Sequence, residues 1–247
     1  SNIFFDVNNY FFLFYAWIWI TCIKTREDIN KLKPYIFAAT LYLAFKTILI
    51  YFIFTHAVSL NIPLIYKWIR DTGVGELTPA PNGFYRVFFQ SHIYLIMAWI
   101  YTMLILFKER NRIRVAIILA LSAFYVSALF LSLSRSFAVG ILSISILILI
   151  VALVYWRFTV KETIYAALVM SASFFGGLVI VLAVSFWPLP ARHPFSLTDV
   201  WGNRFNISDA SASSRWAELS HLWSAIKDHW FLGSGFGKTV TYISNAP

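Results

Sequence analysis

The sequence predicts an all-α polytopic integral membrane protein with six transmembrane helices and a partial outer loop. Of its 247 residues, 60% are hydrophobic and only 13% are charged, whereas soluble domains average about 25% charged residues. Six segments are long and apolar enough to cross a hydrocarbon core of roughly 30 Å as helices. Their apolar runs are continuous and lack the alternation of a membrane barrel, which excludes spanning strands.

These six segments define a transmembrane bundle over residues 1–187, followed by the start of a large outer loop over 188–247. The first segment lacks the basic start and small-residue cleavage site of a signal peptide, so we expect it to span. The single cysteine, Cys22, excludes a disulfide or a Cys-ligated metal centre within this sequence. The predicted spans are 4–23, 35–60, 91–107, 115–134, 136–156 and 163–187.

Three short loops predict the orientation of the bundle. Residues 24–33, 108–114 and 157–162 carry ten of the 20 lysines and arginines, and basic residues in short loops mark the cytoplasmic side. The N-terminus, residues 61–90, the turn around Arg135 and everything after Pro188 are then outside.

Arg135 is the only charged residue between Val115 and Trp156. Both ends of this run are predicted to be cytoplasmic, so the chain must cross, turn at Arg135 and cross back. An arginine costs roughly 2.5–3.5 kcal/mol at mid-bilayer and much less at the boundary. Arg135 is either a snorkelling anchor or a guanidinium held at a defined place by a tight turn with small serines around it.

The predicted outer face carries an unusual set of basic residues, on the side where topology does not require them. Arginine grips phosphate or carboxylate oxygens bidentately, which lysine cannot do, so we expect an anionic ligand at this surface. The alternatives are binding of lipid headgroups and pairing with outer acidic residues. The nine residues are Lys67, Arg70, Arg86, Arg135, Arg192, Arg204, Arg215, Lys227 and Lys238.

Two outer segments precede the third span. Residues 62–70 are short, apolar and basic, which predicts a helix lying in the membrane interface. Arg86 is the only charge in 83–92, a segment rich in aromatic residues that leads into the span. It is either an anchor or a ligand contact at the mouth of the bundle.

A third outer segment predicts an amphipathic helix over about 214–230. Ser213 or Ser214 can cap its start, and tryptophans recur every seven residues from Trp216, forming one apolar stripe suited to the interface. Arg215 would then lie in the first turn, where the helix dipole favours anions. An arginine there is poor for stability alone, which favours ligand binding. The following "GSGFGK" lacks a preceding strand, so it is no nucleotide-binding loop.

Three further residues are weaker candidates. Lys46 lies inside the second predicted span, where ionisable residues are functional by default, although it could also pair internally. Arg204 belongs to the outer basic set. His193 is one of several histidines near the outer face that could act as a base. No pair of histidines has a metal-site spacing, and we expect neither a metal nor a cofactor.

Two of these stretches carry a resemblance to a known family. "SLSRSFAVGILSISILILI" (132–150) resembles the helix hairpin that opens the conserved region of the O-antigen ligase and O-antigen polymerase superfamily. "SRWAELSHLWSAIKDHWFLGSGFG" (214–237) resembles that family's second signature, with Trp230 where proline is usual. The resemblance covers about 115–240, and the first three spans match mainly in hydropathy.

The resemblance implies a bacterial inner-membrane glycosyltransferase of the GT-C kind. Such enzymes take a glycan from undecaprenyl diphosphate at the periplasmic face, without a nucleotide sugar or an obligatory metal, and pass it to a glycan or lipid A core acceptor. By motif position, Arg135 and Arg215 would hold the diphosphate, and Arg86 less securely. The family's catalytic histidine follows later in the outer loop, so the general base is expected beyond Pro247 and the sequence resembles a fragment. Nucleic acid is not an expected partner.

Two other functions remain open at this stage. An anion or small-solute transporter would use the same basic outer face, with Lys46 as a relay, but it requires polar groups along a whole pathway. A non-catalytic membrane scaffold would depend on neither arginine. The sequence does not distinguish a ligase from a polymerase, because acceptor choice is expected to depend on the variable outer loop.

Overall fold

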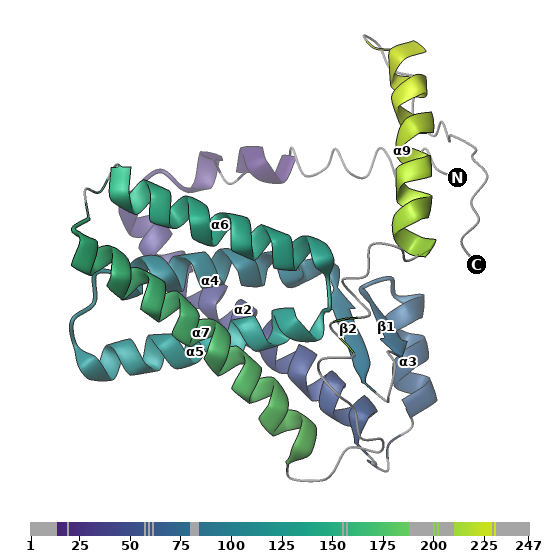
Figure 1. Ribbon diagram of the computed structural model, residues 1–247, viewed down its shortest axis with the longest axis horizontal. Coiled ribbons are helices and arrows are strands. Elements are labelled where there is room, and N and C mark those ends of the chain that lie inside the picture. The colour runs from purple at the N-terminus through teal and green to yellow at the C-terminus, as the bar shows by residue number, and fades with distance from the viewer. Residues whose placement is uncertain are drawn as a thin grey trace. The chain divides into compact units, whose positions relative to one another are not determined.

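The computed structural model (Figure 1) describes residues 14–18, 20–56, 58, 60, 62–79, 84–154, 156, 158–187, 200, 202, 210–228 and 230. The chain divides into two compact units. One consists of Pro34–Phe205, and the other combines Ser1–Lys33 with Asn206–Pro247.

The larger unit is a helical bundle that fits a membrane protein. Among the described residues, four helices are long and apolar enough to cross a bilayer. They are α2 (Arg26–Thr55), α5 (Arg112–Leu131), α6 (Arg135–Val154) and α7 (Val160–Phe186). A shorter apolar helix, α4 (Ile93–Leu106), runs beside α5 and α6 (Figure 1). The prediction of a mostly helical membrane bundle is therefore confirmed.

One of the predicted spans is shorter in the structure, and another is not tested by it. The expected span 91–107 is the helix α4, whose 14 residues cover about 21 Å and fall short of a roughly 30 Å core. It is short because residues 85–89, just upstream, pair as a strand and only the turn Gln90–His92 intervenes. The expected span 4–23 falls largely outside the described residues, so six crossings remain a prediction.

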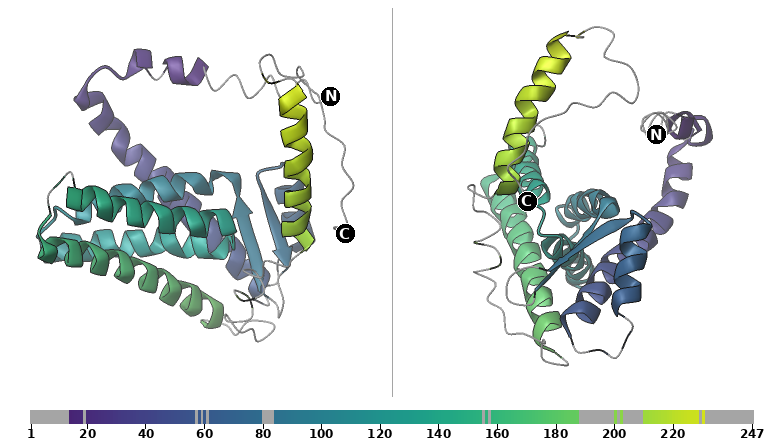
Figure 2. Two further views of the ribbon diagram at one scale, coloured as in Figure 1. Left: turned by 45° about the horizontal axis from the view of Figure 1, so that its top comes forward. Right: turned by 90° about the vertical axis from the view of Figure 1, so that its right-hand side faces the viewer.

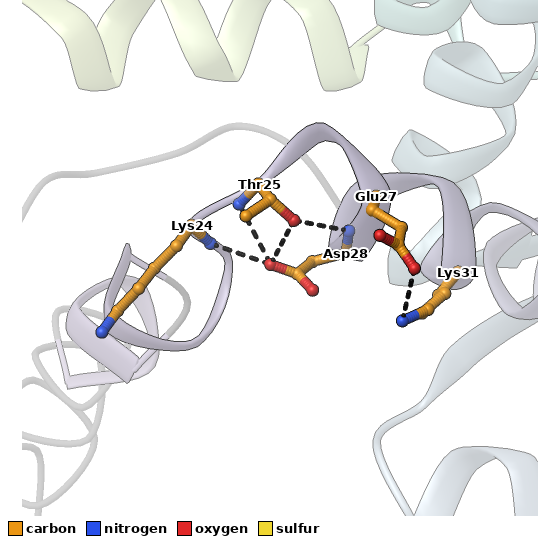
Figure 3. A network of polar contacts seen from close by, with 5 residues as sticks. All are labelled: Lys24, Thr25, Glu27, Asp28 and Lys31. Atoms are coloured by element: carbon orange, nitrogen blue, oxygen red, sulfur yellow. Dashed lines mark hydrogen bonds and ion pairs between the residues drawn. The ribbon is translucent and has the colours of Figure 1, made fainter.

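Helix α2 begins at Arg26, although 24–33 was expected to be a loop. Figure 3 shows the reason: Thr25 and Asp28 exchange side-chain and backbone hydrogen bonds, with Asp28 Oδ2 accepting from Thr25 N at 3.0 Å. This reciprocal arrangement is a capping box. Glu27 and Lys31, one turn apart, form an ion pair of 2.9 Å. Together these contacts start the helix in a charged segment, and Pro34 is carried inside it.

Helices α5 and α7 form the closest pair of the bundle. A Cβ atom added at Gly177 would lie 2.7 Å from Val126 Cγ1, and one at Gly176 would lie 2.9 Å from Ala123 Cβ. These glycines therefore let the two backbones approach, as small residues do in membrane bundles. On the same helix, Ser173 hydrogen-bonds both Ser122 and Trp99 Nε1.

Polar side chains of α2 also find partners across the bundle. Thr40 Oγ1 lies 3.1 Å from Tyr125 Oη on α5, and Tyr51 Oη lies 2.7 Å from Ser185 Oγ on α7. Buried polar groups that pair with each other between helices fix the positions of those helices without forming a hydrated path.

The segment between α2 and α4 contains a β-hairpin that was not predicted. Strand β1 (Gly75–Pro79) pairs antiparallel with β2 (Tyr85–Phe89), with Leu77 opposite Val87. The expected interfacial helix is confirmed as α3 (Ile62–Asp71), which packs beside β1 (Figure 2). The fold is therefore a helical bundle with one small sheet at one end, and not purely α-helical.

The two ends of the bundle can be told apart by their contacts. The hairpin end carries α3, the β1–β2 hairpin and the turn between α5 and α6. At the opposite end, called the basic end below, Arg110 in the linker between α4 and α5 pairs with Glu162 in the first turn of α7 at 4.0 Å. This places two of the three predicted cytoplasmic loops at the same end, as expected.

The other unit contains α9 (Ala210–Asp228), the helix predicted at 214–230. It begins four residues earlier than expected, which makes Arg215 its sixth residue and not part of the first turn. The stretch Ala-Ser-Ala-Ser extends the helix without a breaker. The described members of the predicted apolar stripe are all exposed; they are Leu219, Trp223, Ile226 and Trp230.

Candidate functional site

The turn around Arg135 is as tight as predicted. Helix α5 ends at Leu131 and α6 begins at Arg135, so three residues reverse the chain. Arg135 is the first residue of α6 and is half-buried. The N-terminus of a helix carries unpaired N–H groups and a positive dipole end, which favour an anion.

The turn adopts a strained backbone conformation at Leu133. Its φ of 44° is in the left-handed region, which a bulky residue rarely adopts and which costs about 1–3 kcal/mol. The Leu133 side chain is only 4% exposed and packs in the hydrophobic core of the hairpin end. Burial of this side chain offsets the strain and prevents the turn from relaxing.

Side-chain hydrogen bonds hold the rest of the turn. Ser132 Oγ donates to Leu129 O over 2.6 Å and accepts from Ser134 N over 3.3 Å. Arg86 on β2 donates its Nε proton to Ser132 O over 2.8 Å. That carbonyl lies at the C-terminus of α5, where carbonyl groups lack intrahelical partners. The hairpin β1–β2 therefore braces the turn that presents Arg135.

Arg86 is held firmly by the protein. Its side chain is 16% exposed, Nη1 pairs with Glu76 Oε2 at 3.2 Å, and its Cζ lies 5.0 Å from the Phe88 ring centroid. The structure thus brings Arg86 to the turn of Arg135, as expected for one site, and directs two of its donors at protein oxygens. The bond to Ser132 O attaches the Arg86 side chain to the turn.

Beside the turn lies an apolar cavity of about 260 Å³ between α5, α6 and α7. Three phenylalanines contribute to it, and Ser134 is its one polar lining residue next to Arg135. The cavity is lined by Leu129, Phe130, Ser134, Phe137, Ala138, Ile141, Leu142 and Phe174. A cation at a helix start and an apolar cavity therefore adjoin, which suits a ligand with an anionic head and an apolar tail.

His92 is buried at the start of α4, and both of its ring nitrogens are hydrogen-bonded. Its Nδ1 accepts from Phe89 N at 3.4 Å, so Nε2 carries the proton and donates to Thr47 Oγ1 at 2.9 Å. Thr47 in turn donates to Leu43 O at 2.8 Å. His92 therefore ties α2 to the hairpin and α4 as a neutral structural group, and it has no nitrogen left to act as a base.

Lys46 lies at the hairpin end and contacts aromatic rings. Its Nζ lies 4.6 Å from the Phe89 ring centroid and 5.4 Å from that of Trp68, within the range of cation–π contacts. The neighbouring contact of Thr47 with His92 places this level of α2 beside the start of α4. Lys46 lies inside α2, one of the helices that are long and apolar enough to cross a bilayer, as the sequence predicted.

For the remaining predicted site residues, the structure gives no placement relative to this site. Arg204 and His193 lie outside the described residues. Arg215 lies on α9, in the other unit, and its side chain is outside the described part. Across the part of the chain that the structure describes, no cluster of three or more His, Cys, Asp or Glu residues suits a metal.

Comparisons of this chain with protein-family models, with curated proteins and with solved structures found no match.

Proposed function

We propose that this chain belongs to a metal-independent membrane glycosyltransferase of the O-antigen ligase or polymerase type. It takes a glycan from undecaprenyl diphosphate and passes it to a glycan or lipid A core acceptor, at the periplasmic face of a bacterial inner membrane. The observation that carries this proposal is Arg135, the first residue of α6, in a strained turn braced by Arg86.

The donor fits the chemistry of this turn. The diphosphate would sit at the start of α6 against Arg135, and the first isoprene units would enter the adjacent apolar cavity. Arg215 is proposed as the second guanidinium because of its motif position. Arg86 acts as a positioning residue for the turn, since its Nε is bonded to Ser132 O.

The reaction follows from the charges. An acceptor hydroxyl oxygen bonds to the anomeric carbon, the bond from that carbon to the diphosphate oxygen breaks, and the diphosphate leaves with the electron pair. Negative charge on the diphosphate grows in the transition state, so a fixed guanidinium stabilises that state more than the ground state. The acceptor proton passes to a general base, a role that we assign to none of the described residues.

The pairing of polar groups in the bundle favours this proposal over a transporter. In the described helices, the hydroxyl groups of Thr40, Thr47 and Tyr51 are hydrogen-bonded to partners on other elements. A transport pathway needs polar groups that face water or solute along its length. Apart from Lys46, the basic residues of the described spanning helices lie instead near the helix ends.

A complementation experiment tests the proposal in cells. A strain that lacks the gene containing this sequence is expected to accumulate lipid-linked glycan, with long chains for a ligase and single repeat units for a polymerase. Wild-type gene and Arg112→Ala should restore transfer, and Arg135→Ala should not. Arg112 is the matched control, since it is the first residue of α5 at the basic end. Normal surface polysaccharide with Arg135→Ala would contradict the proposal.

A further inference from the structure

A groove between α2 and α3, separate from the Arg135 turn, combines apolar walls with two lysines. Its volume is about 780 Å³, within the roughly 300–1,000 Å³ range of ligand sites. Its lining residues include Lys46, Leu64, Ile65, Lys67, Trp68 and Asp71. No function described above uses this groove.

The groove is open to the surroundings on its apolar side. Leu64 and Trp68, one turn apart on α3, are 64% and 51% exposed, whereas Ile69 on the opposite face is buried. Helix α3 thus has a second apolar face that the described bundle does not cover. In a membrane, hydrocarbon chains contact such a face.

The charges in the groove are unbalanced. Lys46 and Lys67 contribute two positive charges and Asp71 one negative charge, which leaves a net charge of one positive unit. Among the ion pairs of the described residues, none involves either lysine. Lys46 is instead held over two aromatic rings, and its neighbour Thr47 contacts His92, the residue that precedes α4.

We propose that this groove binds one anionic phospholipid of the surrounding bilayer. The phosphate, with its single negative charge, contacts Lys46 and Lys67, and one acyl chain lies along Leu64, Ile65 and Trp68. A headgroup with one negative charge neutralises the net positive charge of the groove, whereas a diphosphate carries more negative charge than the groove can neutralise. The site stabilises the packing of α3 against α2 and is independent of the glycosyltransferase proposal.

Native mass spectrometry of the purified protein tests this inference, after extraction from vesicles of equal phosphatidylglycerol and phosphatidylethanolamine and without glycan donor. Wild type should retain phosphatidylglycerol selectively. The variant Lys46→Met/Lys67→Met keeps the apolar parts of both side chains. Its retention of phosphatidylglycerol should be roughly 30-fold lower than that of wild type, because each lysine near the surface contributes about fivefold. Lys161→Met, an exposed lysine at the basic end, should retain the lipid like wild type.

Three outcomes would overturn the inference. They are equal retention of both phospholipids by wild type, unchanged retention by the double variant, and selective capture of added undecaprenyl diphosphate in place of phosphatidylglycerol. Arg135→Ala should keep phosphatidylglycerol bound, because Arg135 is not part of the groove. A loss of glycan transfer with normal lipid retention would therefore concern only the Arg135 site.

Discussion

Arg86 on the β-hairpin donates a hydrogen bond of 2.8 Å to the backbone carbonyl of Ser132, in the turn that starts α6. This contact joins the β1–β2 hairpin to the helix pair that carries Arg135. It makes the hairpin part of the candidate site, although no residue of the hairpin needs to touch the ligand.

Replacing Arg86 with alanine should destabilise the hairpin end. The substitution leaves the Ser132 carbonyl without its charged donor, and hydrogen bonds to charged groups contribute about 1.5–3 kcal/mol. We expect a loss of that size in the free energy of unfolding, measured in mixed detergent micelles. Glu76→Gln is the control, since it removes only the partly exposed ion pair, which contributes about 0–1 kcal/mol. Equal effects of the two variants would refute the bracing role.

Leu133→Val should show the strain in the turn. A β-branched side chain tolerates a φ of 44° even less well than leucine does, at a cost of about 1–2 kcal/mol. The control is Leu131→Val, which makes the same change in the last residue of α5. We expect Leu133→Val to lower the unfolding free energy more than Leu131→Val by about 1–2 kcal/mol. A reversed order would mean that the turn is not strained.

Gly177→Ala should weaken the contact of α7 with α5. The added methyl group would approach Val126 Cγ1 to 2.7 Å, and overpacking of this kind costs about 1–3 kcal/mol. Gly140 on α6 has open space around its Cα, so Gly140→Ala should be neutral or slightly stabilising. Thermal unfolding of both variants in the same detergent gives the comparison. No destabilisation by Gly177→Ala would contradict the close approach of the two backbones.

Glu109, in the linker between α4 and α5, should make the stability of the basic end depend on pH. Its carboxylate accepts hydrogen bonds from the backbone N–H groups of Asn111 and Arg110 and lies near Arg114. These contacts hold the pKa of Glu109 below its ordinary value of 4.5, with the bond from Asn111 the largest cause. The stability that these contacts contribute to the folded state is therefore complete above pH 4.5, and it is lost as the pH falls through the lowered pKa.

Glu109→Ala should accordingly lower the Tm at pH 7, and the difference from wild type should shrink as the pH falls below 4. Glu27→Ala provides the control, since its exposed pair with Lys31 contributes little. A Tm difference for Glu109→Ala that persists unchanged at low pH would contradict this account.

The helices were predictable from the sequence because membrane spans carry a strong signal. Long apolar runs separated by basic loops placed α5, α6 and α7 to within three residues at each end, and the lone charge of Arg135 located their turn. Helix α3 followed from its amphipathic pattern. The start of α2 was missed because hydropathy does not register a capping box formed by Thr25 and Asp28.

The hairpin and its role were not predicted. Asn82–Gly83 between two segments of alternating apolar residues is a recognised hairpin signal. No hairpin was predicted there because the prediction rested on the long helical spans. The bracing of the turn by Arg86 has no local sequence signal, because residues 46 positions apart in the chain make this contact. For the same reason, the groove of Lys46 and Lys67 became visible only once α3 was placed beside α2.

The initial rate of glycan transfer by reconstituted protein tests the central claim most directly. With undecaprenyl-diphosphate-linked glycan and its acceptor, Arg135→Ala should reduce kcat by roughly 10²–10³, as the loss of one preorganised donor does. Arg112→Ala, the matched arginine at the opposite end of the bundle, should stay close to wild type. If Arg135→Ala transfers glycan as fast as Arg112→Ala does, the guanidinium at the start of α6 does not act on the diphosphate.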